Sequence, residues 1–362
     1  MNIKVPSYLK RLATLALASA PFAGPQLQAE EVYSQIVGAI ALDIPADSDV
    51  VVSFPFKQSS SYGGRVHSVS GAELDVGDGV SILSSGDFDA VGGQATHYVL
   101  VEDGSLEGRH FDIVSNTDQK ITLDTSENLS GLDQAIITVR EHWTLGEAFP
   151  NGIGSNAVFE ASGPQVQLLV PEEVKVGGGF DVASLYYFYQ GAWRAVGEKL
   201  DLEANGANSN DDVIAPGASV MVRNNSMDDI RTYFFGEVVT SPIAIPIESS
   251  SSDVVDNYVS VSRPLGLTLA EFGLSAGGAF TASTSLAEVD RGDLLLVYSY
   301  TESGKNKTAD QYFLYNNEWY LAGGDGTPVS DTVIKAGQGV VIRKKAGEDG
   351  VNYWTNNWSL DS

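Results

Sequence analysis

The carboxy-terminal two thirds of the chain contains one strand-and-turn pattern twice, and this duplication constrains the fold more than any other feature. The segment Tyr186-Tyr187-Phe188-Tyr189-Gln190-Gly191-Ala192-Trp193 recurs as Tyr312-Phe313-Leu314-Tyr315-Asn316-Asn317-Glu318-Trp319. A second block, from Asp211 to Arg223, recurs from Asp331 to Arg343 with the same internal spacing. Repeated units build length and surface. The repeated residues have strand and turn chemistry, so the duplication predicts two similar β units.

Each copy contains a hairpin with the pattern Tyr-x-x-Tyr-x-x-x-Trp. Gln190-Gly191 and Asn316-Asn317 occupy the turns, where positive φ favours Gly and Asn. Thr144 and Thr268 are each followed three residues later by Glu, which predicts a single capped helical turn in each copy. Little other helix is expected.

Composition favours an all-β fold. The chain of 362 residues has 38 Gly, 15 Tyr, 14 Phe and 5 Trp, and alternating apolar and polar residues are punctuated by Gly, Asp and Ser. We expect two to three barrel- or sandwich-like units: an N-terminal β unit at 30–118 and two repeat copies at 119–240 and 241–362. In this alignment the passage 133–139 matches 257–261.

The first residues are typical of an export signal. Lys4, Lys10 and Arg11 form a basic region, an apolar run covers 12–23, and small residues follow. We predict a signal peptide at 1–29 with cleavage after Ala29, and a buried amino-terminal helix is the alternative. The run is too short to anchor the chain in a bilayer. A secreted or cell-surface location is expected, with the periplasm as an alternative.

The charge of the chain argues against nucleic acid as a partner. There are 47 Asp and Glu against 21 Lys and Arg, a net charge of −26, and removal of 1–29 would make it more acidic. Polyanion binding requires a basic face. There is no cysteine, so disulfides and thiol catalysis are excluded. Partners are expected among surface or matrix proteins or glycans, and self-association remains open.

The sequence contains no recognisable catalytic motif. The four histidines lack the i, i+4 spacing of a zinc protease, and no G-x-S-x-G elbow occurs. We expect no catalytic residue, no cofactor and no metal site. Two alternatives stay open: a calcium ion in acid-rich turns at 75–78, 87–89 or 205–212, and a carboxylate pair that hydrolyses glycans.

The duplicated aromatic residues are the best candidates for ligand binding, because exposed aromatic rings stack on sugars or anchor protein partners. Packing across the hairpin strands is the competing interpretation. If the hairpins bind sugar, these rings should lie exposed on one face. Arg223 and Arg343 are interpreted as strand-end residues that neutralise nearby acids. The six candidates are Tyr186, Tyr189, Trp193, Tyr312, Tyr315 and Trp319.

A set of segments spread over the chain forms a recognisable combination: Asp49–Phe56, Tyr98–Gly108, Ile113–Asn116, His142–Leu145, Phe149-Pro150, Trp193 and Ile214–Arg223. In combination they resemble an uncharacterised family of exported proteins found mainly in the Verrucomicrobia and their relatives. The resemblance covers nearly the whole chain after residue 29, although family members tend to have Pro where this chain has His142. The resemblance implies export and a shared architecture, and it carries no functional residue.

The sequence thus favours an exported, non-catalytic structural or adhesive protein of the cell surface or extracellular matrix. A carbohydrate-binding module that uses the duplicated aromatic hairpins is the first alternative. An exported glycan hydrolase is the second.

Overall fold

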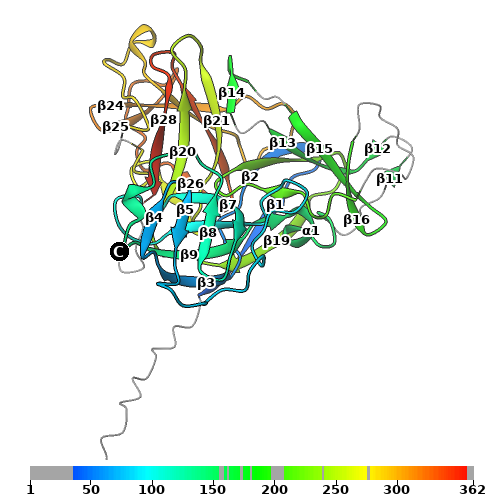
Figure 1. Ribbon diagram of the computed structural model, residues 1–362. Coiled ribbons are helices and arrows are strands. Elements are labelled where there is room, and N and C mark those ends of the chain that lie inside the picture. The colour runs from blue at the N-terminus through cyan, green and yellow to red at the C-terminus, as the bar shows by residue number, and fades with distance from the viewer. Residues whose placement is uncertain are drawn as a thin grey trace, which may run out of the picture. The chain divides into compact units, whose positions relative to one another are not determined.

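Strands make up almost all of the regular structure, which confirms the all-β prediction (Figure 1). The computed structural model describes residues 36–154, 159–160, 163–171, 174–179, 182–196, 208–238, 240–274 and 278–356. In these ranges the only α-helix is α1 (Leu145–Ala148), and no sheet closes into a barrel. None of the helices in these ranges is long and apolar enough to cross a membrane.

Two of the sheets have the same strand order, which shows how the duplication is built. The first sheet has the order β16 (Ala192–Ala195), β15 (Val182–Tyr189), β13 (Val166–Pro171), β18 (Ser219–Asn224), β2 (Ser48–Ser53). The second has the order β25 (Glu318–Leu321), β24 (Asp310–Tyr315), β23 (Leu294–Val297), β27 (Gly339–Lys344), β21 (Val255–Ser260), and β14 (Val174–Val176) follows at its end. The predicted hairpins are present as β15–β16 and β24–β25. Gln190, Gly191, Asn316 and Asn317 all have positive φ.

Smaller strand pairs repeat as well. The two-stranded ribbon of β1 (Val37–Ile44) and β19 (Ile230–Glu237) corresponds to the ribbon of β20 (Ile243–Ser249) and β28 (Gly350–Asn356). The short pair β10 (Trp143–Thr144) and β17 (Val213–Ile214) corresponds to β22 (Leu267–Thr268) and β26 (Val333–Ile334). The first copy therefore takes its strands from 37–53 and 143–237, except that β14 joins the sheet of the second copy, and the other strands of the second copy come from 243–356. A further short pair joins β11 (Phe159–Glu160) to β12 (Gly163–Pro164).

A separate seven-stranded sheet, here called the inserted sheet, interrupts the first copy between β2 and β10. In Figure 1 its strands β4, β5, β8 and β9 are grouped together. The strand order gives β21 the counterpart β2, so the expected match of 133–139 with 257–261 is not observed. As domain limits, 118 and 240 stay predictions. The sheet has the order β3 (Ser60–Arg65), β9 (Ile136–Glu141), β6 (His97–Val101), β7 (His110–Asn116), β8 (Lys120–Leu123), β5 (Glu73–Asp75), β4 (Ser68–Ser70).

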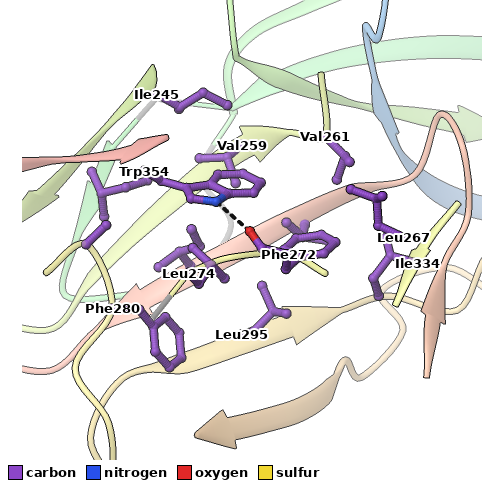
Figure 2. Packing of buried hydrophobic residues seen from close by; sticks show 14 of the residues in the cluster. Ile245, Val259, Val261, Leu267, Phe272, Leu274, Phe280, Leu295, Ile334 and Trp354 are labelled. Atoms are coloured by element: carbon purple, nitrogen blue, oxygen red, sulfur yellow. Dashed lines mark hydrogen bonds between the residues drawn. The ribbon is translucent and has the colours of Figure 1, made fainter. Parts of the chain in front are cut away.

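Each part has its own hydrophobic core. The inserted sheet buries one face, which includes Val99, Phe111 and Val139, and each copy encloses a larger cluster. Figure 2 shows the cluster of the second copy, in which Trp354 stacks on Phe272 with ring centroids 5.3 Å apart. All described residues belong to one compact unit.

Reciprocal hydrogen bonds join the two copies. The Ser53 amide donates to the Gly337 carbonyl (2.9 Å), and the Ser260 amide donates to the Gly217 carbonyl (2.7 Å). The amide of Phe54 donates to Ser260 Oγ, and the amide of Val261 donates to Ser53 Oγ. Equivalent residues thus make equivalent contacts in both directions, as at a two-fold interface between identical subunits.

The capping prediction is confirmed for Thr144, whose side chain and that of Glu147 form a capping box on α1. Thr268 and Glu271 make the same hydrogen bonds, with 2.7 Å between the Thr268 amide and Glu271 Oε2, but the following residues form turns and no α-helix.

Candidate functional site

The six aromatic residues predicted to bind a ligand are mostly packed into the cores. Trp193 and Trp319 are 1% and 3% exposed, and Tyr312 is buried too. Tyr186, Tyr189 and Tyr315 are half-buried. Burial raises the pKa of the Tyr186 and Tyr312 hydroxyls. The buried rings do not form an exposed platform, and a ligand-binding role of the six stays a prediction.

The structure brings a different pair of aromatic residues to the surface. Tyr233 and Phe235 are 54% and 58% exposed on the outer side of β19, and their rings stack with centroids 6.3 Å apart. Phe234, between them, points inward and is buried, as the alternation of a strand requires. The exposed side of the β1–β19 ribbon, here called the open face, carries Val37, Ala39, Ala41, Asp43, Arg231, Tyr233 and Phe235.

Small residues lie opposite the rings across the open face. Ala41 pairs with Tyr233 and Ala39 pairs with Phe235, while Asp43 pairs with Arg231 at the end of the ribbon. Arg231 Nε lies 2.5 Å from Asp43 Oδ1. The hydrogen bond from Arg231 lowers the pKa of the Asp43 carboxyl. The open face is thus a flat apolar surface with an exposed ion pair at one end.

A groove of about 490 Å³ runs beside the two rings. Trp143, Glu147 and Asn151 line it together with Tyr233 and Phe235. Aromatic surface with a few polar groups is typical of ligand sites. The groove and the open face together form the candidate site.

The equivalent face of the second copy is partly covered by the inserted sheet and its loops. Ala244, the counterpart of Ala39, is 1% exposed, and its amide donates to the Gly108 carbonyl (2.9 Å). The guanidinium of Arg109 lies 3.7 Å above the ring of Tyr353, the counterpart of Tyr233. Glu127 accepts hydrogen bonds from Arg109 (2.9 Å) and from the Tyr353 hydroxyl (2.7 Å). The face of the second copy is therefore covered around Ala244 and Tyr353 and exposed at Val351, whereas the open face is exposed along its whole length.

A row of ionisable side chains lies on the second face of the inserted sheet. Tyr98 pairs with Asp112 on β7 and with Arg140 on β9, so the three side chains share one face. Arg140 Nη2 lies 2.8 Å from Glu237 Oε1 in β19. His142 Nε2 lies 3.1 Å from Asp112 Oδ1, although neither His142 ring nitrogen has a partner with hydrogen-bond geometry in the described ranges.

Burial lowers the pKa values of two side chains beside this row, Lys57 and His110. Lys57 is 5% exposed, and burial together with the charges of Arg140 and Arg263 lowers the pKa of its ammonium to about 8. Burial and the charge of Lys57 lower the pKa of His110 to about 4. These groups lie where the inserted sheet meets the two copies, so this region is here called the junction.

A cavity of about 360 Å³ opens beside the junction and is lined by His97, Glu141, His142, Glu147 and Asp211. It is the best position for the hydrolase alternative. Glu147, however, already accepts hydrogen bonds from the Thr144 amide, the Thr144 hydroxyl and Gln58 Nε2. These bonds hold the Glu147 side chain against the capped turn of α1.

The structure describes most of the acid-rich turns considered for calcium. Asp75 Oδ1 accepts the amides of Gly77 and Asp78, and Asp89 Oδ1 accepts the amide of Asn116. Residues 205–207 lie outside the described ranges. Within these ranges no group of three or more His, Asp or Glu is placed to hold a metal ion. Calcium binding stays a prediction.

No known protein family, curated protein or solved structure matches the chain. The resemblance to an uncharacterised exported family stays a prediction. The function is therefore argued from the site alone.

The sequence did not reveal the open face. Arg231, Tyr233 and Phe235 alternate with inward residues, but Val351, Tyr353 and Thr355 do so too. Alternation shows that two faces differ and does not show which one another part of the chain covers.

Proposed function

We propose that the chain is an exported, non-catalytic structural or adhesive protein that works through its outer faces. The open face carries this proposal. It exposes two stacked aromatic rings and a row of aliphatic side chains, whereas its counterpart is partly covered by protein around Ala244 and Tyr353. Contiguous apolar surface of this kind is typical of interaction sites. Its presence in only one copy suggests a partner that the other copy does not need.

Export is the second part of the proposal. It is supported by the order of basic, apolar and small residues at 1–29, which lie outside the described ranges. The acidic charge supports solubility in salty surroundings.

Fractionation of producing cells tests both parts. We expect the wild-type chain in the surface or matrix fraction and the double variant Tyr233→Ser/Phe235→Ser in the medium, because the variant loses the apolar anchor. Thermal unfolding of both proteins is the folding control, since the two rings lie outside the cores. A cytosolic wild type, or equal surface retention of both proteins, would contradict the proposal.

Carbohydrate binding at the same place is the second candidate. Tyr233 and Phe235 are exposed beside a groove that also contains Glu147 and Asn151, and sugars combine apolar C–H faces with hydroxyl groups. A glycan array tests it. Binding by the wild type and loss of binding by Tyr233→Ser/Phe235→Ser would support a sugar site, and no signal on any glycan would exclude it.

A further inference from the structure

We propose that the open face binds the open face of a second copy of this chain. This inference deepens the proposed function and rests on it for the use of that surface. A second copy is inferred as the partner for two reasons. The second copy of the repeat shows which groups cover such a ribbon face, and the open face carries the same kinds of group.

The covered face provides the template. There, an arginine and a carboxylate from another part of the chain cover one tyrosine: Arg109 lies over the ring of Tyr353, and Glu127 accepts a hydrogen bond from its hydroxyl. A cation over an aromatic face is attracted by the ring quadrupole. Arg109 and Glu127 also form an ion pair with each other, so the positive charge over the ring is matched by a negative one. A partner for Tyr233 should therefore present an arginine paired with an acid.

The open face presents that pair itself. Arg231 and Asp43 lie in the row next to Tyr233 and Ala41, on the same side of the ribbon. Rows two residues apart on a strand are about 7 Å apart. Consider a two-fold axis that lies in the plane of the interface, between these two rows and parallel to them. This axis places Arg231 of each copy over Tyr233 of the other. One face can therefore serve both copies, as an isologous interface requires.

The remaining surface fits the same arrangement. Val37, Ala39 and Ala41 form a low aliphatic row beside the rings, so no large side chain of β1 keeps a facing copy away from them. The face has far fewer residues than the roughly 20 to 30 on each side of a stable interface. We therefore expect a weak dimer that forms at tens of micromolar or above. The net charge of −26 opposes association, so the measurement needs about 0.15 M salt to screen distant charges.

Sedimentation velocity over a concentration series tests the proposal. The wild type should shift from monomer to dimer, and Tyr233→Ser/Phe235→Ser should weaken the dimer by about tenfold or more because it loses both rings. Val351→Ser is the matched control, since Val351 occupies the row of the covered ribbon that corresponds to Arg231. It should dimerise like the wild type. A wild type that stays monomeric to millimolar concentration would overturn the proposal, as would a double variant with unchanged affinity.

Charge exchange separates a specific interface from a folding defect. Asp43→Arg gives a face with two bases, and Arg231→Asp gives a face with two acids. Each variant alone should dimerise about tenfold more weakly than the wild type, because like charges then face each other across the axis. An equimolar mixture should recover affinity close to that of the wild type. Failure of the mixture to recover would exclude the two-fold arrangement.

The outcomes also separate this inference from the proposed function. A monomeric wild type whose surface retention depends on Tyr233 and Phe235 would keep the adhesive role and assign the face to another protein. A monomer whose glycan-array signal depends on these rings would assign it to sugar. A specific dimer that is found in the cytosol would leave the interface and overturn the proposed function.

Discussion

An ion pair between an arginine and a buried aspartate occurs at equivalent positions in the two copies. Arg223 forms a two-pronged pair with Asp49, and Arg343 forms the same pair with Asp256, with Nε–Oδ1 distances of 2.7 Å in both. Both aspartates are buried and both arginines are partly exposed. The interpretation of Arg223 and Arg343 as residues that neutralise nearby acids is thus confirmed. Because each carboxylate lies directly opposite its arginine on the neighbouring strand, the pair favours one strand register.

Loss of a buried carboxylate should cost much more than loss of an exposed one. Asp256→Ala leaves Arg343 without its buried partner, and we expect the free energy of unfolding to fall by about 2–4 kcal/mol. Asp43→Ala is the matched control, because the Asp43–Arg231 pair has similar geometry but is exposed. We expect a change of about 1 kcal/mol or less for it. Urea titration measures both, and equal losses would show that burial does not determine the strength of these pairs.

At the scale of elements, the two copies satisfy one buried carbonyl in different ways. In the first copy the indole of Trp193, on the hairpin, donates to the Phe149 carbonyl (2.9 Å). In the second copy Trp354, on the terminal strand, donates to the equivalent Phe272 carbonyl (2.8 Å), as Figure 2 shows. Phe234 occupies the place of Trp354 in the first copy and has no N–H to donate. The hydrogen bond is thus present in both copies, but its donor comes from a different element in each.

Tryptophan substitutions should therefore have different effects in the two hairpins. Trp193→Phe leaves the Phe149 carbonyl buried without its indole donor, and we expect a loss of about 1–3 kcal/mol beyond the loss of packing. Trp319→Phe is the matched control in the other hairpin, since its indole makes no hydrogen bond to any described residue. We expect Trp193→Phe to be the more destabilising of the two in thermal or urea unfolding. The reverse order would contradict the assigned role of the hydrogen bond.

The sequence predicted the individual strands and turns better than the way in which the strands pair into sheets. Turn residues such as Asn316-Asn317 and the Thr144–Glu147 capping box act locally, so their patterns predicted the hairpins and α1. The ribbon β1–β19 joins strands that are almost 200 residues apart, and β1 and β2 look like any other alternating segments. Their place in the first copy depends on long-range pairing. For the same reason the exposure of Tyr233 could not be predicted, because it depends on which ribbon the inserted sheet covers.

At the scale of the whole molecule, the inserted sheet joins the two copies through ionisable groups. Its second face carries Tyr98, Asp112 and Arg140; Arg140 pairs with Glu237 of the β1–β19 ribbon, and Tyr98 packs in the core of the second copy. Lys57 and His110 lie in this junction with pKa values below their ordinary values, because burial disfavours their charged forms. The protonation of these two groups therefore opposes folding.

The sign of this effect is testable at Lys57. The folded pKa of about 8 lies below the ordinary value near 10.5, so between these values the unfolded chain binds more protons than the folded one. The free energy of unfolding should consequently rise with pH from about 7.5 to 9.5, a range below the ordinary pKa of tyrosine. At pH 7 Lys57 is charged in both the folded and the unfolded state, so the full desolvation penalty of its ammonium lowers the free energy of unfolding. Lys57→Met removes that cost and keeps an unbranched side chain of similar length, so we expect a gain of about 1–3 kcal/mol at pH 7 and a loss of the rise with pH.

Lys120→Met is the control for the removal of a lysine as such. Lys120 is exposed and pairs with Glu73, which raises the pKa of its ammonium. Its substitution should bring no gain in stability at pH 7 and should leave the rise between pH 7.5 and 9.5 in place. Urea unfolding of the wild type and both variants at several pH values decides the matter. If Lys57→Met were less stable than the wild type at pH 7, the Lys57 ammonium would be a stabilising contact of the junction. The interactions lost with the ammonium would then outweigh the desolvation penalty that the substitution removes.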